Sequence, residues 1–125
     1  MDIIGVGSPA ILKLENFGAW LWKAFDTPAY LVGSAAKGKQ WRDVDIRMCL
    51  SDEAFNEMFG ELGFHSPKFG LLCSAISLLG KEMTGLPIDF QFQSYHTFQS
   101  YPRTDHNRHA LGVFYLLDRK VAEQE

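Results

Sequence analysis

Hydrophobic residues recur at helical spacing in three segments of the chain. Ser8 is the expected N-cap of the first helix, Ser51-Asp52-Glu53 is expected to start the second with acids in its first turn, and Ser66 is the expected N-cap of the third. Proline follows the first and third of these serines and is expected at the first helical position. The expected apolar stripes are Ile11, Leu14, Gly18, Leu21 and Phe25, then Phe55, Met58, Phe59 and Leu62, and finally Phe69, Leu72, Ile76, Leu79 and Met83.

Three shorter segments are typical of strands. Residues 29–32 form an apolar run that stops at Gly33-Ser34. Residues 43–50 and 88–93 alternate, so one face of each strand packs on the core and the other carries polar groups. The polar positions are Asp43, Asp45 and Arg47 in the first strand and Asp89, Gln91 and Gln93 in the second.

The order helix–strand–strand–helix–helix–strand predicts the fold class α/β (α+β), with a small mixed sheet backed by helices. Residues 1–125 form one expected domain whose core runs from about 29 to 93. Beyond Ser94 the pattern weakens, and residues 110–117 fit either a final strand or a short helix.

Composition narrows the class of protein. A net charge of −3, from 12 basic and 15 acidic residues, weighs against a protein that coats nucleic acid. The N-terminus has no basic segment followed by an apolar stretch, and no window is long and apolar enough to span a membrane. With only Cys49 and Cys73, both expected as buried thiols, we expect a cytoplasmic protein that does not contact the membrane.

Three features of the sequence point to chemistry. Gly33-Ser34 ends a buried strand, where glycine lets a ligand approach the backbone and serine can face an anion. Asp43 and Asp45 share one face of the second strand, and Asp89 is the acid on the polar face of the third. Carboxylates gathered in this way are typical ligands of two divalent cations, Mg²⁺ or Mn²⁺, in phosphoryl and nucleotidyl transfer.

The spacing of these features resembles a known signature. Gly33-Ser34, eight intervening residues and the Asp-Val-Asp-Ile sequence at 43–46 are similar to the motif of the DNA polymerase β-type nucleotidyltransferase superfamily. The stretch from Tyr30 to Met48 resembles especially the minimal nucleotidyltransferases and the antibiotic-modifying members of that superfamily. Asp89, between Ile88 and Phe90, matches the third acid of that family in residue type and neighbours.

The resemblance implies a role for each motif residue. Asp43 and Asp45 would bind both metals, while Asp89 would complete the second metal site and help deprotonate the attacking hydroxyl. Ser34 and the backbone around Gly33 would hold the triphosphate. Two departures from the family are visible. Arg42 stands where small relatives often have serine, and the chain is too short for the helical domain that closes over the nucleotide in many members.

Basic residues surround the motif and allow two interpretations. Lys37, Lys39, Arg42 and Arg47 could clamp a triphosphate, or could be solvated and balance the nearby aspartates. Arg47 is the favoured clamp because it shares the face of the first two aspartates.

Residues beyond the last strand could also contribute. The aromatic residues Tyr95, Phe98 and Tyr101 could stack a base or form a surface for a partner. Arg103 and Arg108 are candidates for contacts to phosphate or acceptor. A zinc site at His106 and His109 is not expected, because no third ligand lies close in sequence.

Two functions follow from these residues. The first is an enzyme that moves a nucleoside monophosphate from a nucleoside triphosphate such as ATP to a hydroxyl of an RNA end, a protein or a small molecule. The second is a non-catalytic nucleotide- or metal-binding module that regulates a partner, since small members of the family often act with a helical protein, including in toxin–antitoxin pairs. The sequence also leaves open whether the chain forms a homodimer. The complete set of three acids favours the enzyme.

Overall fold

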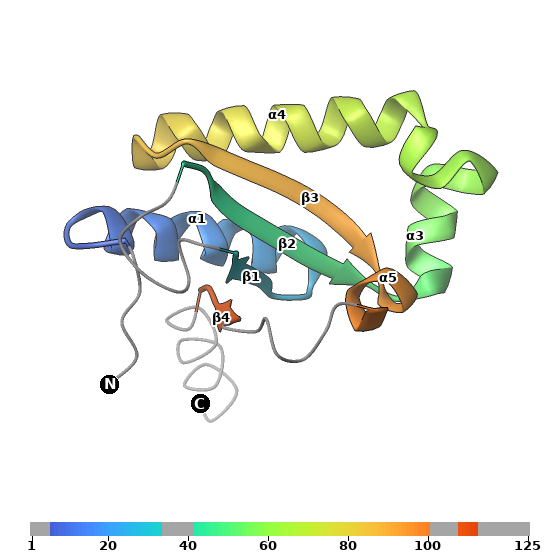
Figure 1. Cartoon of the computed structure of the whole chain (residues 1–125), viewed down its shortest axis with the longest axis horizontal. Helices are drawn as coiled ribbons and strands as arrows, with labels where there is room; N and C mark the ends of the chain where they lie inside the picture. The colour runs from blue at the N-terminus through green and yellow to red at the C-terminus, as the bar shows by residue number, and fades with distance from the viewer. Residues whose placement is uncertain (1–5, 34–41, 101–107, 113–125) are drawn as a thin grey trace.

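A computed structural model describes residues 6–33, 42–100 and 108–112 of the chain. The elements follow the predicted order, with three short additions, a 3-10 helix in the middle of the chain and two elements at the C-terminal end (Figure 1). They are α1 (Ala10–Phe25), β1 (Ala29–Val32), β2 (Val44–Leu50), α3 (Asp52–Phe59), the 3-10 helix η1 (Gly60–His65), α4 (Pro67–Thr84), β3 (Ile88–Ser94), α5 (Tyr95–Ser100) and β4 (His109–Ala110). The predicted α/β class with a mixed sheet is confirmed.

The four described strands form one sheet in the order β3-β2-β1-β4. β2 and β3 are parallel, whereas β1 is antiparallel to both of its neighbours. The connection from β2 to β3 passes through α3, η1 and α4, as a crossover between parallel strands requires. In the β2–β3 register Val44 pairs with Ile88 and Asp45 pairs with Asp89.

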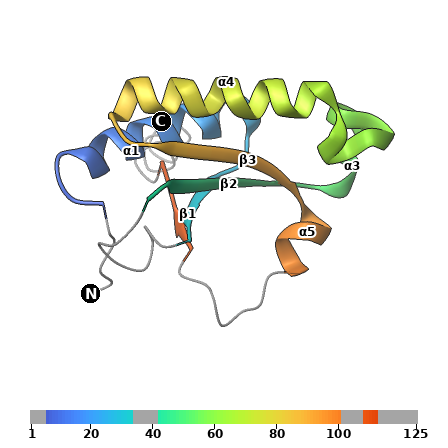
Figure 2. The ribbon, with the colours of Figure 1, turned by 45° about the horizontal axis from the view of Figure 1, so that its top comes forward.

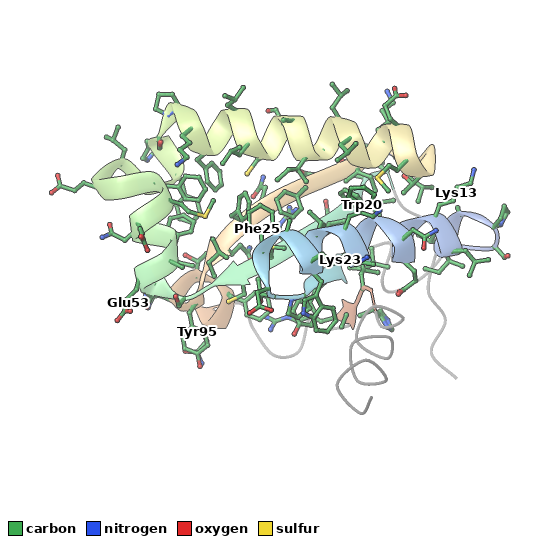
Figure 3. All side chains as sticks on the ribbon, turned by 180° about the vertical axis from the view of Figure 1, so that it is seen from behind. Lys13, Trp20, Lys23, Phe25, Glu53 and Tyr95 are labelled. Carbon is green, nitrogen blue, oxygen red and sulfur yellow. The ribbon has the colours of Figure 1, made fainter. Side chains whose placement is uncertain are left out.

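The helices α1 and α4 cover one face of the sheet (Figure 2). Among the described residues, the opposite face carries only α5, at one end, and we call it the open face. The alternating strands explain this arrangement, because their apolar side chains point toward the two helices. Phe25 at the end of α1 points toward the sheet (Figure 3), where its ring meets that of Phe92 with 5.2 Å between centroids. The sheet residues that are fully or almost fully buried are Ala29, Leu31, Val44, Ile46, Met48, Phe90 and Phe92.

The outer edge of β3 is closed by α4. The N–H of Phe90 donates to Ser77 Oγ at 2.8 Å, and the N–H of Phe92 hydrogen-bonds the sulfur of Cys73. Residues four apart on a helix advance about 6 Å, and residues two apart on a strand advance nearly 7 Å, so the two repeats match. Two outward N–H groups of an edge strand are therefore paired within the chain, which protects the edge from other strands.

The segment that carries β4 packs directly on α1. A Cβ at Gly18 would lie 2.3 Å from Leu111 Cβ and 3.0 Å from the Leu111 carbonyl carbon. The N–H of Gly112 donates to Glu15 Oε2 at 2.8 Å. Gly18, expected only as part of an apolar stripe, therefore provides the space in which residues 111–112 cross the helix.

The capping prediction is confirmed at α4 and wrong at α1. Ser66 Oγ accepts from the N–H of Lys68. Ser51, expected only to start α3, also caps that helix by accepting from the N–H of Ala54. Ser8 caps nothing, because α1 begins one residue later than expected, with Pro9 in the N-cap position and no side-chain hydrogen bond there.

Three burial predictions are also wrong. Leu62 is 61% exposed because α3 ends at Phe59 and the chain continues as a 3-10 helix. Leu79 is exposed because the face of α4 that packs on the protein passes through Cys73 and Gly80 instead. Gln93, expected on an open polar face, is buried at the end of β3 that leads into α5.

Other sequence expectations have plain outcomes. Cys73 is buried as expected, whereas Cys49 is only partly buried. In residues 110–117, Ala110 belongs to the short strand β4, and residues 113–117 lie outside the described part of the chain. Among the described helices, none combines the length and apolar character needed to cross a membrane.

Residues 111–112 cross α1 so closely at Gly18 that adding a single methyl group there should have a large effect on stability. We expect Gly18→Ala to lower the free energy of unfolding by about 1–3 kcal/mol, as for overpacked cores, because its Cβ would collide with Leu111. Gly70→Ala in α4 is the matched control, since its Cβ would meet nothing within 4 Å. That substitution should stabilise by about 0.5–1 kcal/mol through helix propensity. Urea denaturation measures both changes, and equal stability of the two variants would contradict this packing.

Candidate functional site

Two carboxylates lie side by side on the open face of the sheet. Asp45 in β2 and Asp89 in β3 are register partners, and both belong to the strand positions that point away from α1 and α4. Neighbouring strands are about 4.8 Å apart, so side chains at paired positions on one face are within mutual reach. The Asp45 side chain is 28% exposed and that of Asp89 is 43% exposed.

The environment disfavours a negative charge on Asp45. Burial raises the pKa of this carboxyl, the nearby Arg47 lowers it, and the charges of Asp89 and Asp43 raise it further. A hydrogen bond between the Asp45 and Asp89 carboxyl groups acts in the same direction, and the net effect is a raised pKa. The fold therefore holds two acids where ionising both is costly, which is typical of sites that bind cations.

Arg47 lies next to both carboxylates. Its Nη1 donates to the backbone carbonyl of Asp89 at 2.7 Å and to that of Ile46 at 3.0 Å. Its Nη2 lies 3.4 Å from Asp89 Oδ2 and 3.8 Å from Asp45 Oδ1. The favoured phosphate clamp is thus engaged with the aspartates, which corresponds to the second of the two interpretations of the basic residues.

Gly33 meets the site through its backbone. Its φ of +72° is in the left-handed region, and a Cβ there would lie 2.5 Å from Asp45 Oδ2. Any other residue would be strained and would push the carboxylate aside. Glycine at this position, expected from the sequence to admit a ligand, is required by the position of Asp45 itself.

Asp43 stands at the edge of the same site. It precedes β2 directly and is exposed, and the N–H of the next residue, Val44, donates to the Pro87 carbonyl at 2.9 Å. Asp43 and Asp89 both line a groove of about 690 Å³ between β3 and α4. The polar residues that line the rest of the groove are Ser74, Ser77, Lys81 and Gln91.

Asp45 and Asp89 suit a metal ion that takes the rest of its coordination shell from water or from a substrate phosphate. Two adjacent carboxylates are hard oxygen donors whose repulsion, visible in the raised pKa of Asp45, a divalent cation would relieve. In residues 6–33, 42–100 and 108–112, no three histidine, cysteine, aspartate or glutamate side chains converge closely enough to hold a metal. Asp43 therefore does not join the pair in this conformation. Mg²⁺ commonly takes only one or two carboxylates and completes its shell with water and phosphate.

The other predicted site residues near the motif either lie outside the described part of the chain or are exposed. Ser34, Lys37 and Lys39 lie outside the described residues, as do Arg103 and His106. Arg42 is exposed just before β2.

An aromatic and cationic cluster on the open face was only partly predicted. The rings of Tyr30 in β1 and Phe98 in α5 are 5.8 Å apart, and the Arg108 guanidinium lies 3.9 Å from the centroid of Phe98. Arg108 also donates to the Phe98 carbonyl at 3.2 Å. Tyr30 pairs with Arg47 across β1 and β2, so the cluster adjoins the row of acids. The sequence signal that could have placed Tyr30 here is the two-residue period of a strand, which puts Tyr30 and Val32 on the face opposite Ala29 and Leu31.

Comparison of the chain with known protein families, with curated proteins and with solved structures gave no match.

The raised pKa of Asp45 predicts how stability depends on pH. Because the folded pKa lies above the unfolded value of 3.8, ionisation of Asp45 costs stability as pH rises through the folded pKa. We expect Asp45→Asn to raise the free energy of unfolding at pH 7 by about 0.5–2 kcal/mol, as for other charge optimisations. The gain should vanish below the unfolded pKa, where both proteins are neutral at this position.

Denaturation with chelator present, at several pH values, measures this difference. Glu57→Gln, which removes an exposed carboxylate of α3, is the control and should change stability little at any pH. An Asp45→Asn protein less stable than the parent at pH 7 would show that the charge of Asp45 is favourable in the fold.

Proposed function

We propose that the chain is a metal-dependent nucleotidyltransferase that moves a nucleoside monophosphate from a nucleoside triphosphate to a hydroxyl acceptor. The observation that carries the proposal is the pairing of Asp45 with Asp89 on parallel strands. The two carboxyls hydrogen-bond each other, and this hydrogen bond and the charge of Asp89 both raise the pKa of Asp45. Gly33, from the motif that resembles the polymerase β-type superfamily, packs against one of these carboxylates. Motif residues distant in sequence thus meet at one place.

Asp45 and Asp89 would hold the metal, with Asp43 as the third ligand once its exposed side chain turns inward. Bound Mg²⁺ or Mn²⁺ would neutralise the negative charge that accumulates on the phosphates during transfer. Asp89 is the more exposed acid of the pair and lines the groove beside α4. It is therefore positioned to accept the proton of an acceptor hydroxyl that enters along the groove.

Arg47 keeps the two acids in place before a metal arrives. Its bond to the Asp89 carbonyl fixes the guanidinium to the neighbouring strand, and its charge offsets part of the repulsion between the carboxylates. We expect it to remain a positioning residue. Contacts to the triphosphate are left to the backbone at Gly33 and to Ser34, Lys37 and Arg42, as the resemblance and the basic composition of this stretch imply.

The groove has the polar lining that an acceptor with a hydroxyl group would need. It combines the acids Asp43 and Asp89 with the amide of Gln91, the ammonium of Lys81 and the hydroxyl of Ser74. Such a lining suits a polar molecule or a polar segment of a protein or RNA that carries a hydroxyl. The nucleotide would occupy the open face beyond Asp45, where Tyr30 and Arg108 offer stacking surfaces.

The alternative is a non-catalytic module that binds nucleotide or metal and regulates a partner. The position of Arg47 favours it, because a guanidinium within 4 Å of both carboxylates supplies part of the charge that a metal would bring. Only two acids converge in the described part of the chain, which also suits weak metal binding. The two functions differ in whether pyrophosphate is released.

Binding and turnover of nucleotide test the proposal directly. We expect at least one nucleoside triphosphate to bind in the presence of Mg²⁺ and to release pyrophosphate when an acceptor is supplied. Asp45→Asn and Asp89→Asn should each lower turnover by about a hundredfold or more, the scale for removing a group that stabilises transition-state charge. Glu57→Gln should leave turnover unchanged. Calorimetry measures the binding, and labelled nucleotide follows the transfer.

The outcomes separate the two functions. Metal-dependent binding without pyrophosphate release, for every acceptor class tested, would favour the regulatory module. Binding that needs no metal and survives both aspartate substitutions would exclude a metal site at these residues and overturn the proposal.

A further inference from the structure

A stripe of exposed residues runs the length of α4 on the side away from the sheet. Its members are spaced three and four residues apart, the spacing of a helix that packs against another helix. They are Lys68, Leu71, Ala75, Leu78 and Glu82, and all are exposed. Leu71 is 69% exposed and Leu78 is 64% exposed, with Leu79 beside them at 50%. We refer to these six residues as the α4 stripe.

The α4 stripe is not needed for the core. The opposite side of α4 packs on the protein through Phe69, Cys73, Gly80 and Thr84, which are all buried. Three exposed leucines on one helix face, with a charged residue at each end, mark a surface suited to another helix. None of the six is one of the acids of the candidate site, and Leu78 alone among them lines the groove beside those acids.

Two copies of the α4 stripe, placed antiparallel, present complementary residues to each other. An antiparallel copy centred on Ala75 places Leu71 of each copy opposite Leu79 of the other. It also places Leu78 of each copy opposite Leu72 of the other, a partly buried residue beside the stripe. Lys68 then lies opposite Glu82 of the second copy, and Glu82 opposite its Lys68. A small residue at the centre allows the two helices to approach closely. We propose that two copies of this chain associate through α4, antiparallel, about a two-fold axis at Ala75.

The charges at the two ends of the α4 stripe favour a second copy of the chain as the partner and an antiparallel arrangement of the two helices. A parallel pair would place lysine against lysine at one end and glutamate against glutamate at the other, whereas the antiparallel pair forms two Lys68–Glu82 pairs. A partner of different sequence would need its own complement to both ends, but a second copy supplies that complement automatically. The 18 residues of α4 are about 27 Å long. A face of that length reaches only the lower range of specific interfaces, so the dimer is expected to be weak and concentration-dependent.

The dimer contact lies away from the paired acids Asp45 and Asp89. The buried side of α4 faces the sheet and the α4 stripe faces the opposite way, whereas Asp45 and Asp89 occupy strand positions that point away from α1 and α4. Leu78 lies at the margin of the groove that we assign to the acceptor, so the dimer contact borders this groove. Nucleotide binding and dimerisation are measured separately, so the failure of one proposal is distinguishable from the failure of the other.

Sedimentation of the full chain over a wide concentration range tests the proposal. The parent protein should show a monomer–dimer equilibrium. Leu71→Glu combined with Leu78→Glu should weaken dimerisation at least about a hundredfold, the scale for losing central interface residues, with an unchanged circular dichroism spectrum because both positions are exposed. Leu62→Glu, an equally exposed leucine on η1, is the matched control and should leave the dimer intact.

A charge exchange tests the antiparallel arrangement. Lys68→Glu should weaken the dimer about tenfold, because two surface ion pairs become repulsive. Lys68→Glu with Glu82→Lys should restore it, since the exchanged charges face each other again. A parent chain that stays monomeric at every concentration would overturn the proposal and leave the stripe to a partner of another sequence. A dimer insensitive to the two leucine substitutions, or a charge exchange that fails to restore it, would also overturn it.

Discussion

The parallel pairing of β2 with β3 is the constraint on which the rest of the structure depends. Its register places Ile46 beside Phe90 and Met48 beside Phe92 under the two helices, and this apolar face cannot be moved to water without losing the core. Because side chains alternate, the same register must place Asp45 beside Asp89 on the other face. The juxtaposition of the acids is thus a consequence of how the core is packed, and the fold does not need a favourable contact between them.

The juxtaposition has an electrostatic cost that the protein relieves only in part. Arg47 approaches both carboxylates and bonds to the backbone of β3, yet the pKa of Asp45 remains raised by burial and by its acidic neighbours. Residual strain of this kind is common where stability is exchanged for function. A cation bound between Asp45 and Asp89 would relieve the repulsion between the two carboxylates. The electrostatics of the metal-free chain therefore support the nucleotidyl transfer that we propose.

Features set by neighbours in sequence were predicted well, and features set by distant packing were not. Ser51 and Ser66 cap helices because their hydroxyls act within one turn, and alternation placed Asp45 and Asp89 on one face of the sheet. The close approach of residue 111 to Gly18 depends on a contact between distant segments. The partners of Arg47 depend likewise on the register of two strands, which no local pattern specifies. Helix α5 was missed because its six residues carry no periodic apolar signal.

The most direct test of the central claim is a titration of the aspartate side chains by ¹³C nuclear magnetic resonance, with and without Mg²⁺. We predict that Asp45 titrates above the ordinary aspartate range, because of its burial and the neighbouring charge of Asp89, and that Mg²⁺ lowers the pKa of Asp45 and shifts the resonances of both carboxyls. A titration of Asp45 in the ordinary aspartate range that Mg²⁺ leaves unchanged would contradict this prediction, because Asp45 would then neither interact with its acidic neighbour nor bind the metal.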